Sequence, residues 1–274
     1  MKKQILTLSA AAFMAALTCQ TAFALDHDVV ILHTNDTHCG IEENMGYAGL
    51  VWYENQMKEE TPYVTLVDAG DAIQGAPVGT LSEGEYLVQI MNKAGYDFAV
   101  PGNHEFDYGM EKLLGLSARL DCGYSACNFV NLPSKTQVFA PYRIMEYDDI
   151  QVAFVGVATP ESITKSTPAY FQDQFGRYRF GFCEDETGEA LYSQVQSAVD
   201  QARGEGADYV IMVGHLGDNG ITEKWSSRSV IANTTGIDAA IDGHSHEVCV
   251  ENVPNENGEM VVPRPVPSLP TSES

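Results

Sequence analysis

The chain has 274 residues and a formal net charge of −23, from 38 acidic side chains against 15 basic ones. A surface this negative repels nucleic-acid backbones and anionic lipids, which excludes both as bulk partners. It also repels a phosphorylated small molecule unless bound cations reverse the field locally. The charge therefore favours a metal-dependent protein if its ligand is anionic.

Residues 1–24 have the pattern of a secretory signal peptide. A basic start precedes a short apolar stretch, and Ala22 and Ala24 stand where a cleavage site needs small residues. The stretch is far shorter than the roughly 20 residues that a membrane span needs, and no later segment is apolar enough to span a membrane. Cys19 raises a lipoprotein alternative, but the residues before it fit a lipobox poorly. We predict a secreted, periplasmic or cell-surface protein.

Residues 25–250 are predicted to form one α/β domain, because apolar runs between turn residues alternate with helical patterns. Strands are expected at 26–37 (with its loop), 63–69, 96–100, 124–130, 137–159, 208–213 and 237–242. Helices are expected at 46–60, 82–95, 109–120 and 188–204. The alternation is β-α-β, with one antiparallel-looking patch in the middle.

Within this pattern, the helix at 82–95 is predicted to open with a capping box of Ser82 and Glu85 and to end at Gly95. The segment 151–160 gives the clearest buried strand, whereas 161–187 has no pattern that we can organise. Residues 251–274 hold five of the twelve prolines. We expect them to form a Pro-rich tail, mostly unstructured after about residue 262.

The cysteines do not form a metal motif. Five remain after signal-peptide removal, so they cannot all pair, and their spacing matches no zinc-finger pattern. Cys122 and Cys127 are near enough in sequence to pair, which the sequence alone leaves open. Small buried residues or surface thiols are the favoured interpretation.

Metal-binding types of side chain follow five of the apolar runs. The stretches are HTNDTHCG (33–40), LVDAGD (66–71), VPGNHEFD (100–107), VGHLG (213–217) and IDGHSH (241–246). In open α/β sheets, ligands bind at the carboxyl ends of the strands. Nitrogen and oxygen ligands without thiolates favour a catalytic site for Mn, Zn, Fe or Co. We therefore predict a divalent-metal site at a sheet edge.

Local spacing gives this prediction detail. Asp36 and His38 are one residue apart, so in an extended loop both would point the same way toward one ion. His244 and His246 repeat that spacing. Asp71 follows Gly70, which permits a close approach of the backbone, and its carboxylate can bridge two metals.

The motifs D-x-H, G-D, G-N-H-E, G-H and G-H-x-H, in this order, resemble the calcineurin-like metallophosphoesterase superfamily. The longer words NDTHCG, GDAIQG, GNHEFDYG and DGHSH resemble more narrowly the secreted bacterial 5′-nucleotidase family, which includes UDP-sugar hydrolases and 2′,3′-cyclic phosphodiesterases. The resemblance covers about residues 28–250. It implies a four-layer α/β/β/α sandwich with a dinuclear metal centre.

The resemblance also implies residue roles. One metal would be held by Asp36, His38, Asp71 and His246. The other would be held by Asp71, Asn103, His215 and His244, with Asp71 as the bridge. Asn103 and His104 would contact the substrate phosphate, His104 as a non-ligand histidine oriented by Asp107. A metal-bound hydroxide would attack phosphorus in line, and His104 would stabilise the transition state or assist the leaving oxygen. Glu105 is expected to be structural.

The predicted function is a two-metal hydrolase that releases phosphate from small phosphate esters, most specifically nucleotides. The same centre would serve a cyclic phosphodiesterase, a UDP-sugar hydrolase or a sulfur-ester hydrolase. The family's nucleotidases carry a C-terminal domain that grips the nucleoside, and the tail at 251–274 does not match it. We therefore expect that domain to be absent, which leaves a truncated metal-binding domain with little activity as a further alternative. The sequence leaves the metal identity and the oligomeric state open.

Overall fold

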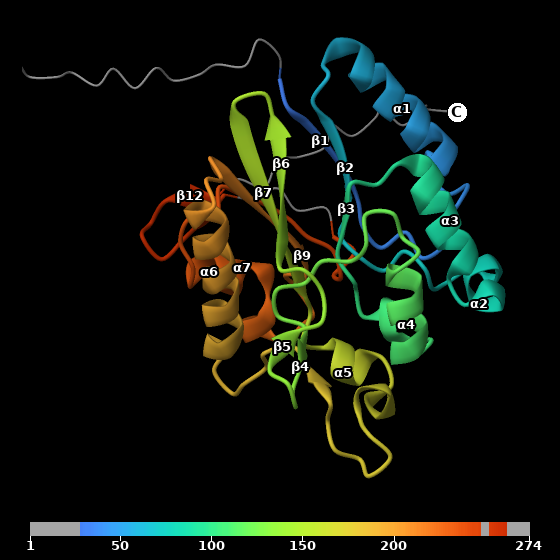
Figure 1. Cartoon of the computed structure of the whole chain (residues 1–274), viewed down its shortest axis with the longest axis vertical. Helices are drawn as coiled ribbons and strands as arrows, with labels where there is room; N and C mark the ends of the chain where they lie inside the picture. Colours follow the sequence, from blue (N-terminus) through green and yellow to red (C-terminus); the bar gives the residue numbers. More distant parts are fainter. Residues whose placement is uncertain (1–27, 248–251, 262–274) are drawn as a thin grey trace, which may run out of the picture.

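The computed structural model describes residues 28–247 and 252–261. The predicted signal peptide, Cys249 and most of the predicted tail lie outside the described residues. Two β-sheets form the centre of the molecule (Figure 1). The first has the order β1-β2-β3 and is parallel throughout. Its strands are β1 (Val30–Thr34), β2 (Val64–Asp68) and β3 (Phe98–Ala99).

The second sheet has the order β10-β9-β7-β6. Its strands are β6 (Tyr142–Tyr147), β7 (Ile150–Ala158), β9 (Tyr209–His215) and β10 (Ala239–Ile241). β7, β9 and β10 are parallel, and β6 is antiparallel to β7. This hairpin confirms the antiparallel patch expected in the middle of the chain.

Helices cover the outer face of each sheet (Figure 1). On the first sheet lie α1 (Gly46–Glu60), α2 (Pro77–Ser82), α3 (Glu85–Ala94) and α4 (Met110–Ser117). On the second lie α6 (Glu189–Gly204) and α7 (Ser227–Ala232). The layers are therefore α/β/β/α, the four-layer sandwich that the motifs implied.

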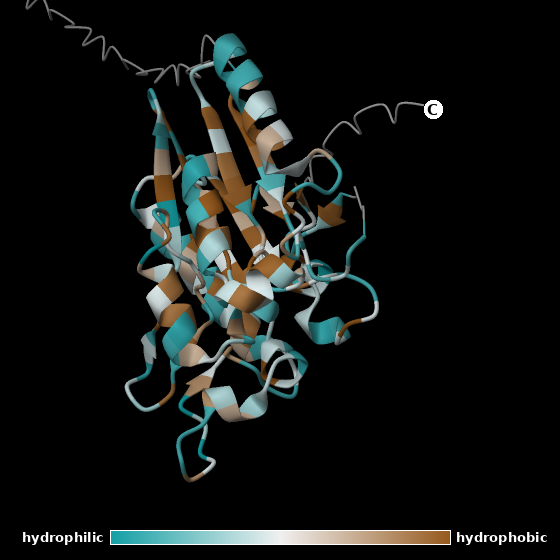
Figure 2. Ribbon diagram, turned by 90° about the vertical axis from the view of Figure 1, so that its right-hand side faces the viewer, coloured by the Kyte–Doolittle hydropathy of each residue, from teal (hydrophilic) through white to brown (hydrophobic). Residues whose placement is uncertain are grey.

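Three separate apolar clusters fill the three interfaces between these layers. Along β7, Val152 and Phe154 pack between the two sheets, whereas Ala153, Val155 and Val157 pack on the α6 side. This alternation follows from the two-residue period of a strand. A sheet buried on both faces needs an almost continuous apolar run, which is why 151–160 is the clearest strand in the sequence. Figure 2 shows hydrophobic residues concentrated along the central strands.

Short elements complete the fold. They are η1 (His104–Phe106), β4 (Val130–Asn131), β5 (Thr136–Gln137), α5 (Ser162–Lys165), η2 (Pro168–Phe171), β8 (Phe180–Gly181), η3 (Glu223–Trp225), β11 (Val253–Pro254) and β12 (Met260–Val261). The unorganised stretch 161–187 thus contains α5, η2 and β8. The beginning of the predicted tail forms the β11–β12 hairpin, whose Val253 and Val261 join the α6-side cluster.

Three local predictions were wrong. No strand spans 124–130, where the structure has an isolated bridge between Ser125 and Ala140 and the start of β4 at Val130. The helix at 82–95 is two helices, because α2 ends at Ser82 and Gly84 precedes α3 with a φ of 81°. Ser82 is no N-cap, since its hydroxyl donates to the Val78 carbonyl within α2. The capping box is therefore absent, although α3 does end at Gly95 as predicted. β1 is half-buried because it lies at the edge of its sheet.

The described cysteines Cys39, Cys122, Cys127 and Cys183 are free thiols. Three of them are buried, and burial raises the pKa of the Cys127 thiol well above its usual range, in agreement with the structural interpretation. Among residues 28–247 and 252–261, no helix is long and apolar enough to cross a membrane.

Candidate metal centre

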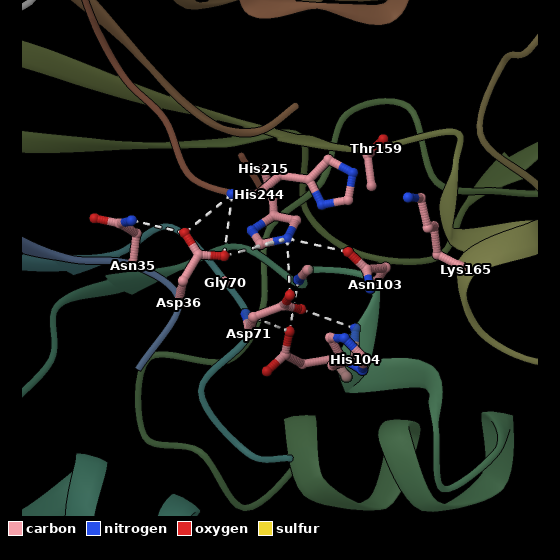
Figure 3. A network of polar contacts seen from close by, with 12 residues as sticks. Asn35, Asp36, Gly70, Asp71, Asn103, His104, Thr159, Lys165, His215 and His244 are labelled. Carbon is pink, nitrogen blue, oxygen red and sulfur yellow. Dashed lines mark hydrogen bonds and ion pairs between the residues drawn. The ribbon is translucent and has the colours of Figure 1, made fainter. Parts of the chain in front are cut away.

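The carboxyl ends of the parallel strands in both sheets meet at one edge of the sandwich. Two contacts join the edges (Figure 3). The backbone N–H of His244, after β10, donates to Asp36 Oδ2, after β1, at 3.0 Å. Nε2 of His215, at the end of β9, lies 3.2 Å from Asp71 Oδ2, after β2. The side chains singled out in five separate stretches of sequence are therefore brought to one place.

One group of potential ligands contains Asp36, His38 and His246, whose ligand atoms all lie within 4.8 Å of one another. The Nε2 atoms of His38 and His246 are 3.2 Å apart. His246 Nε2 is 3.4 Å from Asp36 Oδ1, and the His246 side chain is 58% exposed. This group forms the open side of the cluster.

A second group contains Asp71, His215 and His244, again within 4.8 Å of one another. Asn103 lies next to this second group, with its Oδ1 3.3 Å from Nε2 of His215. His215 is fully buried. This group forms the closed side of the cluster, and the rings of His215 and His244 lie side by side in it, with centroids 5.0 Å apart.

Asp71 lies between the two groups. Its Oδ2 is 3.2 Å from Nε2 of His215 and 3.9 Å from Nε2 of His38. Its Oδ1 accepts a hydrogen bond from the backbone N–H of His104 at 2.8 Å. The Asp71 carboxylate thus lies within reach of histidines from both groups.

The residues present fit divalent cations. Nδ1 of His215 donates to the Ala69 carbonyl at 2.7 Å, and Nδ1 of His38 donates to the Gln74 carbonyl at 3.1 Å. Both Nε2 atoms therefore carry lone pairs when these rings are neutral. Those lone pairs face further acceptors, Asn103 Oδ1 for His215 and the carboxylate of Asp71 for both. Acceptors that face one another at such distances need a cation between them, and nitrogen and oxygen donors without thiolate suit Mn, Zn, Fe or Co.

The charges of the site also suit a bound cation. Burial by itself opposes ionisation of Asp71 and protonation of His215, but their mutual attraction outweighs burial. The pKa of Asp71 is therefore held below its usual range, and the pKa of His215 is raised. In the ion-free protein a proton on His215 thus neutralises Asp71, and a divalent ion would take over that role.

The loops reach this arrangement through left-handed backbone rather than through the extended loop that we expected. Five of the predicted ligands have positive φ, namely Asp36 (49°), His38 (43°), Asp71 (59°), His244 (79°) and His246 (53°). Each such residue costs about 1–3 kcal/mol and persists only where surrounding structure enforces it. The tight turns also separate His244 from His246, so these two side chains join different groups instead of facing one ion.

Glu105 holds the loop that carries Asp71. This side chain is fully buried, and its carboxylate accepts four backbone N–H groups. The donors are Asp71 (2.8 Å), Ala72 (2.8 Å), Ile73 (3.2 Å) and Gly102 (2.6 Å). The structural role expected for Glu105 is confirmed. Gly70 permits the close approach expected of it, because an added Cβ would lie 2.6 Å from the backbone nitrogen of Gly102.

His104 and Asp107 form a hydrogen-bonded pair beside the cluster, and a nitrogen of His104 lies within 4.8 Å of ligand atoms of His38 and Asp71. Nδ1 of His104 lies 2.6 Å from Asp107 Oδ2, and this hydrogen bond raises the pKa of His104. The His104 ring packs edge-on against His38, with centroids 5.2 Å apart. One nitrogen of His104 is therefore occupied by Asp107, and the ring stands next to the open side.

Sequence reasoning missed Glu161. It follows β7 at the same sheet edge, and its Oε2 lies 3.1 Å from Nε2 of His244. The sequence did contain a signal for Glu161. It is an acidic residue directly after the clearest predicted strand, and the predicted ligands also follow strands. It was overlooked because the region after residue 160 has no regular pattern.

The family model for calcineurin-like phosphoesterases matches residues 29–248, which is most of the chain. The chain therefore belongs to the calcineurin-like phosphoesterase family. This family uses a divalent metal centre, in agreement with the groups of ligands at the joined sheet edges.

Known relatives agree with this assignment. The chain is 28% identical over 241 residues to the 5′-nucleotidase of Bos taurus. The matched region covers 80% of this chain and 38% of that protein. It is 26% identical over 278 residues to the 2′,3′-cyclic-nucleotide 2′-phosphodiesterase/3′-nucleotidase of Yersinia enterocolitica, covering 90% and 41%. The NAD nucleotidase of Haemophilus influenzae shares the fold, with a TM-score of 0.71 at 22% identity over 86% of this chain and 44% of that one. The chain spans less than half the length of these proteins.

Proposed function

We propose that this chain is a two-metal phosphoesterase that releases phosphate from nucleotides. The observation that carries the proposal is that Asp71 Oδ2 lies near Nε2 of both His215 and His38, which belong to different groups of ligands. Asp36, His38, Asp71 and His246 would hold one ion, and Asp71, Asn103, His215 and His244 the other. Mn, Zn, Co and Fe all suit these donors.

When bound, the two cations would activate a water molecule and offset the charge on the phosphoryl oxygens. The protein's own groups would orient the substrate. The His104 imidazole would contact the phosphate from the open side of the cluster, and the Asn103 amide from the closed side. The Asp107 carboxylate keeps the proton of His104 on Nδ1 and thereby fixes the ring, so the same ring can stabilise the developing charge or assist the leaving oxygen.

Nucleotides are proposed as substrates because the relatives that cover most of this chain bear the names of nucleotide phosphoesterases. A cyclic phosphodiester is the second candidate, favoured by the similarity to the Yersinia enterocolitica protein over 90% of this chain. We further propose residues 25–250 as the catalytic domain and export directed by residues 1–24, which rest on the motif span and on the signal-peptide pattern.

The test is hydrolysis by the purified protein with added manganese. Activity on p-nitrophenyl phosphate that disappears with a chelator would support the metal-dependent phosphoesterase. A panel of AMP, 2′,3′-cyclic AMP and UDP-glucose would then separate the nucleotidase from the alternatives. A protein that binds two ions but hydrolyses none of these would instead be a metal-binding domain with little activity.

A further inference from the structure

Glu161 links three of the loops that build the cluster. It lies between β7 and α5 and is 7% exposed. Its Oε1 accepts the backbone N–H of Thr222 at 2.8 Å and the Thr222 hydroxyl at 2.7 Å. Its Oε2 faces Nε2 of His244 at 3.1 Å, with the Lys165 ammonium further away at 3.9 Å. Thr222 thus occupies one carboxylate oxygen, and His244 has the nearer approach to the other.

The contact with Glu161 decides which nitrogen of His244 is available. A carboxylate can only accept, so His244 donates through Nε2–H, and the lone pair of its neutral ring lies on Nδ1. His38 and His215 are arranged the other way round. Each donates through Nδ1 to a backbone carbonyl and keeps the Nε2 lone pair. His244 is therefore inverted relative to these two histidines, and its acceptor carries a full negative charge.

A charged acceptor has two chemical consequences for a histidine ligand. It fixes the tautomer and the ring orientation, and it makes the far nitrogen a stronger donor to a metal. The His244 side chain is only 6% exposed, so water has little access to replace Glu161 in this role. Glu161, which lies outside the five sequence stretches singled out above, is thus placed to influence any ion held by His244.

We propose that Glu161 is a positioning residue that holds His244 with Nδ1 directed to the ion shared with Asp71, Asn103 and His215. Glu161 is not itself a ligand, because its two oxygens are directed to Thr222 and to His244. The proposal rests on the proposed function, since it assumes that this group of residues binds an ion. It predicts that Glu161 controls the closed metal position and leaves the open position with His246 unaffected.

Glu161→Gln is a sharp test because Thr222 dictates how glutamine must sit. Both donors of Thr222 require the amide oxygen, so the amide NH₂ would face Nε2 of His244. That nitrogen would then accept, which moves the ring proton to Nδ1 and blocks the ligand position. We expect binding of one ion to weaken by about 10–100-fold and binding of the other to change less than about twofold.

Two measurements on the full chain check this. Titration calorimetry with Mn²⁺ gives the affinities of both ions, and nitrogen-15 NMR of the ion-free protein at pH 8 gives the tautomer of His244. We expect Nε2–H in the wild type and Nδ1–H in Glu161→Gln. If the wild-type protein carries the His244 proton on Nδ1, the proposal is overturned. This measurement needs no variant, so the proposal stays testable even if Glu161→Gln does not fold.

The matched control is Asp185→Asn. Asp185 also accepts several backbone N–H groups, at the start of α6, but it contacts no residue of the cluster. This variant should lose stability and keep both affinities. If the wild type binds no ion, the proposed function fails. If the wild type binds two ions and Glu161→Gln binds both unchanged, the positioning role alone fails.

Discussion

Nδ1 of His104 and a carboxylate oxygen of Asp107 are joined by a 2.6 Å hydrogen bond. Both residues belong to the short turn around η1 that follows β3. The two residues are three apart in the sequence, so the pair forms within one short stretch of the chain. The backbone N–H of His104 also donates to Asp71 Oδ1. The backbone of one residue thus supports the proposed bridge, while its side chain faces the open side of the cluster.

His104→Ala should therefore keep the metal content and lower turnover by about 10²–10⁴-fold, because the backbone contact survives and the imidazole is lost. Elemental analysis and turnover on p-nitrophenyl phosphate measure the two effects. A fall in metal content would make His104 a ligand. Unchanged turnover would leave it a loop histidine held by hydrogen bonds.

Asp71→Ala should lose both ions, because its carboxylate is the only side chain shared by the two proposed positions. Asp36→Ala is the comparison, since Asp36 belongs to one group only and should cost chiefly one ion. Elemental analysis after reconstitution with manganese distinguishes the variants. Retention of one tightly bound ion by Asp71→Ala would count against the bridge.

Gly102→Ala should disturb the same carboxylate without removing it. An added Cβ would lie 2.2 Å from Asp71 Oδ1, far inside contact distance. We expect lower stability and weaker ion binding together, measured by urea unfolding and calorimetry. The matched control is Gly115→Ala within α4, where nothing lies within 4 Å of the new atom. It should stabilise the protein by about 0.5–1 kcal/mol, and equal behaviour of the two variants would refute the steric argument.

The stability of the ion-free protein should depend on Asp68. This carboxyl is fully buried, and burial raises its pKa from 3.8 to about 8, against hydrogen bonds from Thr34 and Gly70 that lower it. A raised folded-state pKa contributes stability that is complete below about pH 4 and is lost as the pH rises to about 8. Asp68→Asn cannot ionise and lacks this dependence.

The wild type should therefore lose stability relative to Asp68→Asn as the pH rises through this window, by about 1.4 kcal/mol per pH unit. Urea titrations of both proteins with a chelator, from pH 4 to pH 8, give the difference directly. A constant difference across the window would mean that Asp68 is already ionised in the folded state at low pH.

Much of the fold could be predicted because its signals are local. The runs that became β2, β7 and β9 are mostly apolar, since most of their residues are buried. Helix α6 matches its predicted range closely because Leu191, Val195 and Val199 face the core at helical spacing. The break at Gly84 was missed, although a glycine inside a helical pattern is a local signal for one. Gly84 has a φ of 81°, and a Cβ there would lie 3.0 Å from Ile73 and Leu116.

The sequence by itself determined which kinds of side chain follow each strand, and hence that a metal site lies at a sheet edge. This was possible because strand hydrophobicity and residue identity are properties of short segments. The roles assigned to single ligands stay predictions until ions are measured.

The resemblance implied how these side chains divide between two groups, but only the tertiary structure decided which ring nitrogens face them. His38 contacts His246, which is 208 residues away in the sequence, and His244 contacts Glu161, which is 83 residues away. Such pairings depend on how two separate sheets are placed against each other and on left-handed turns at five of the predicted ligands. Periodicity carries no information on either, because it describes each segment alone, whereas the centre is formed by contacts between segments.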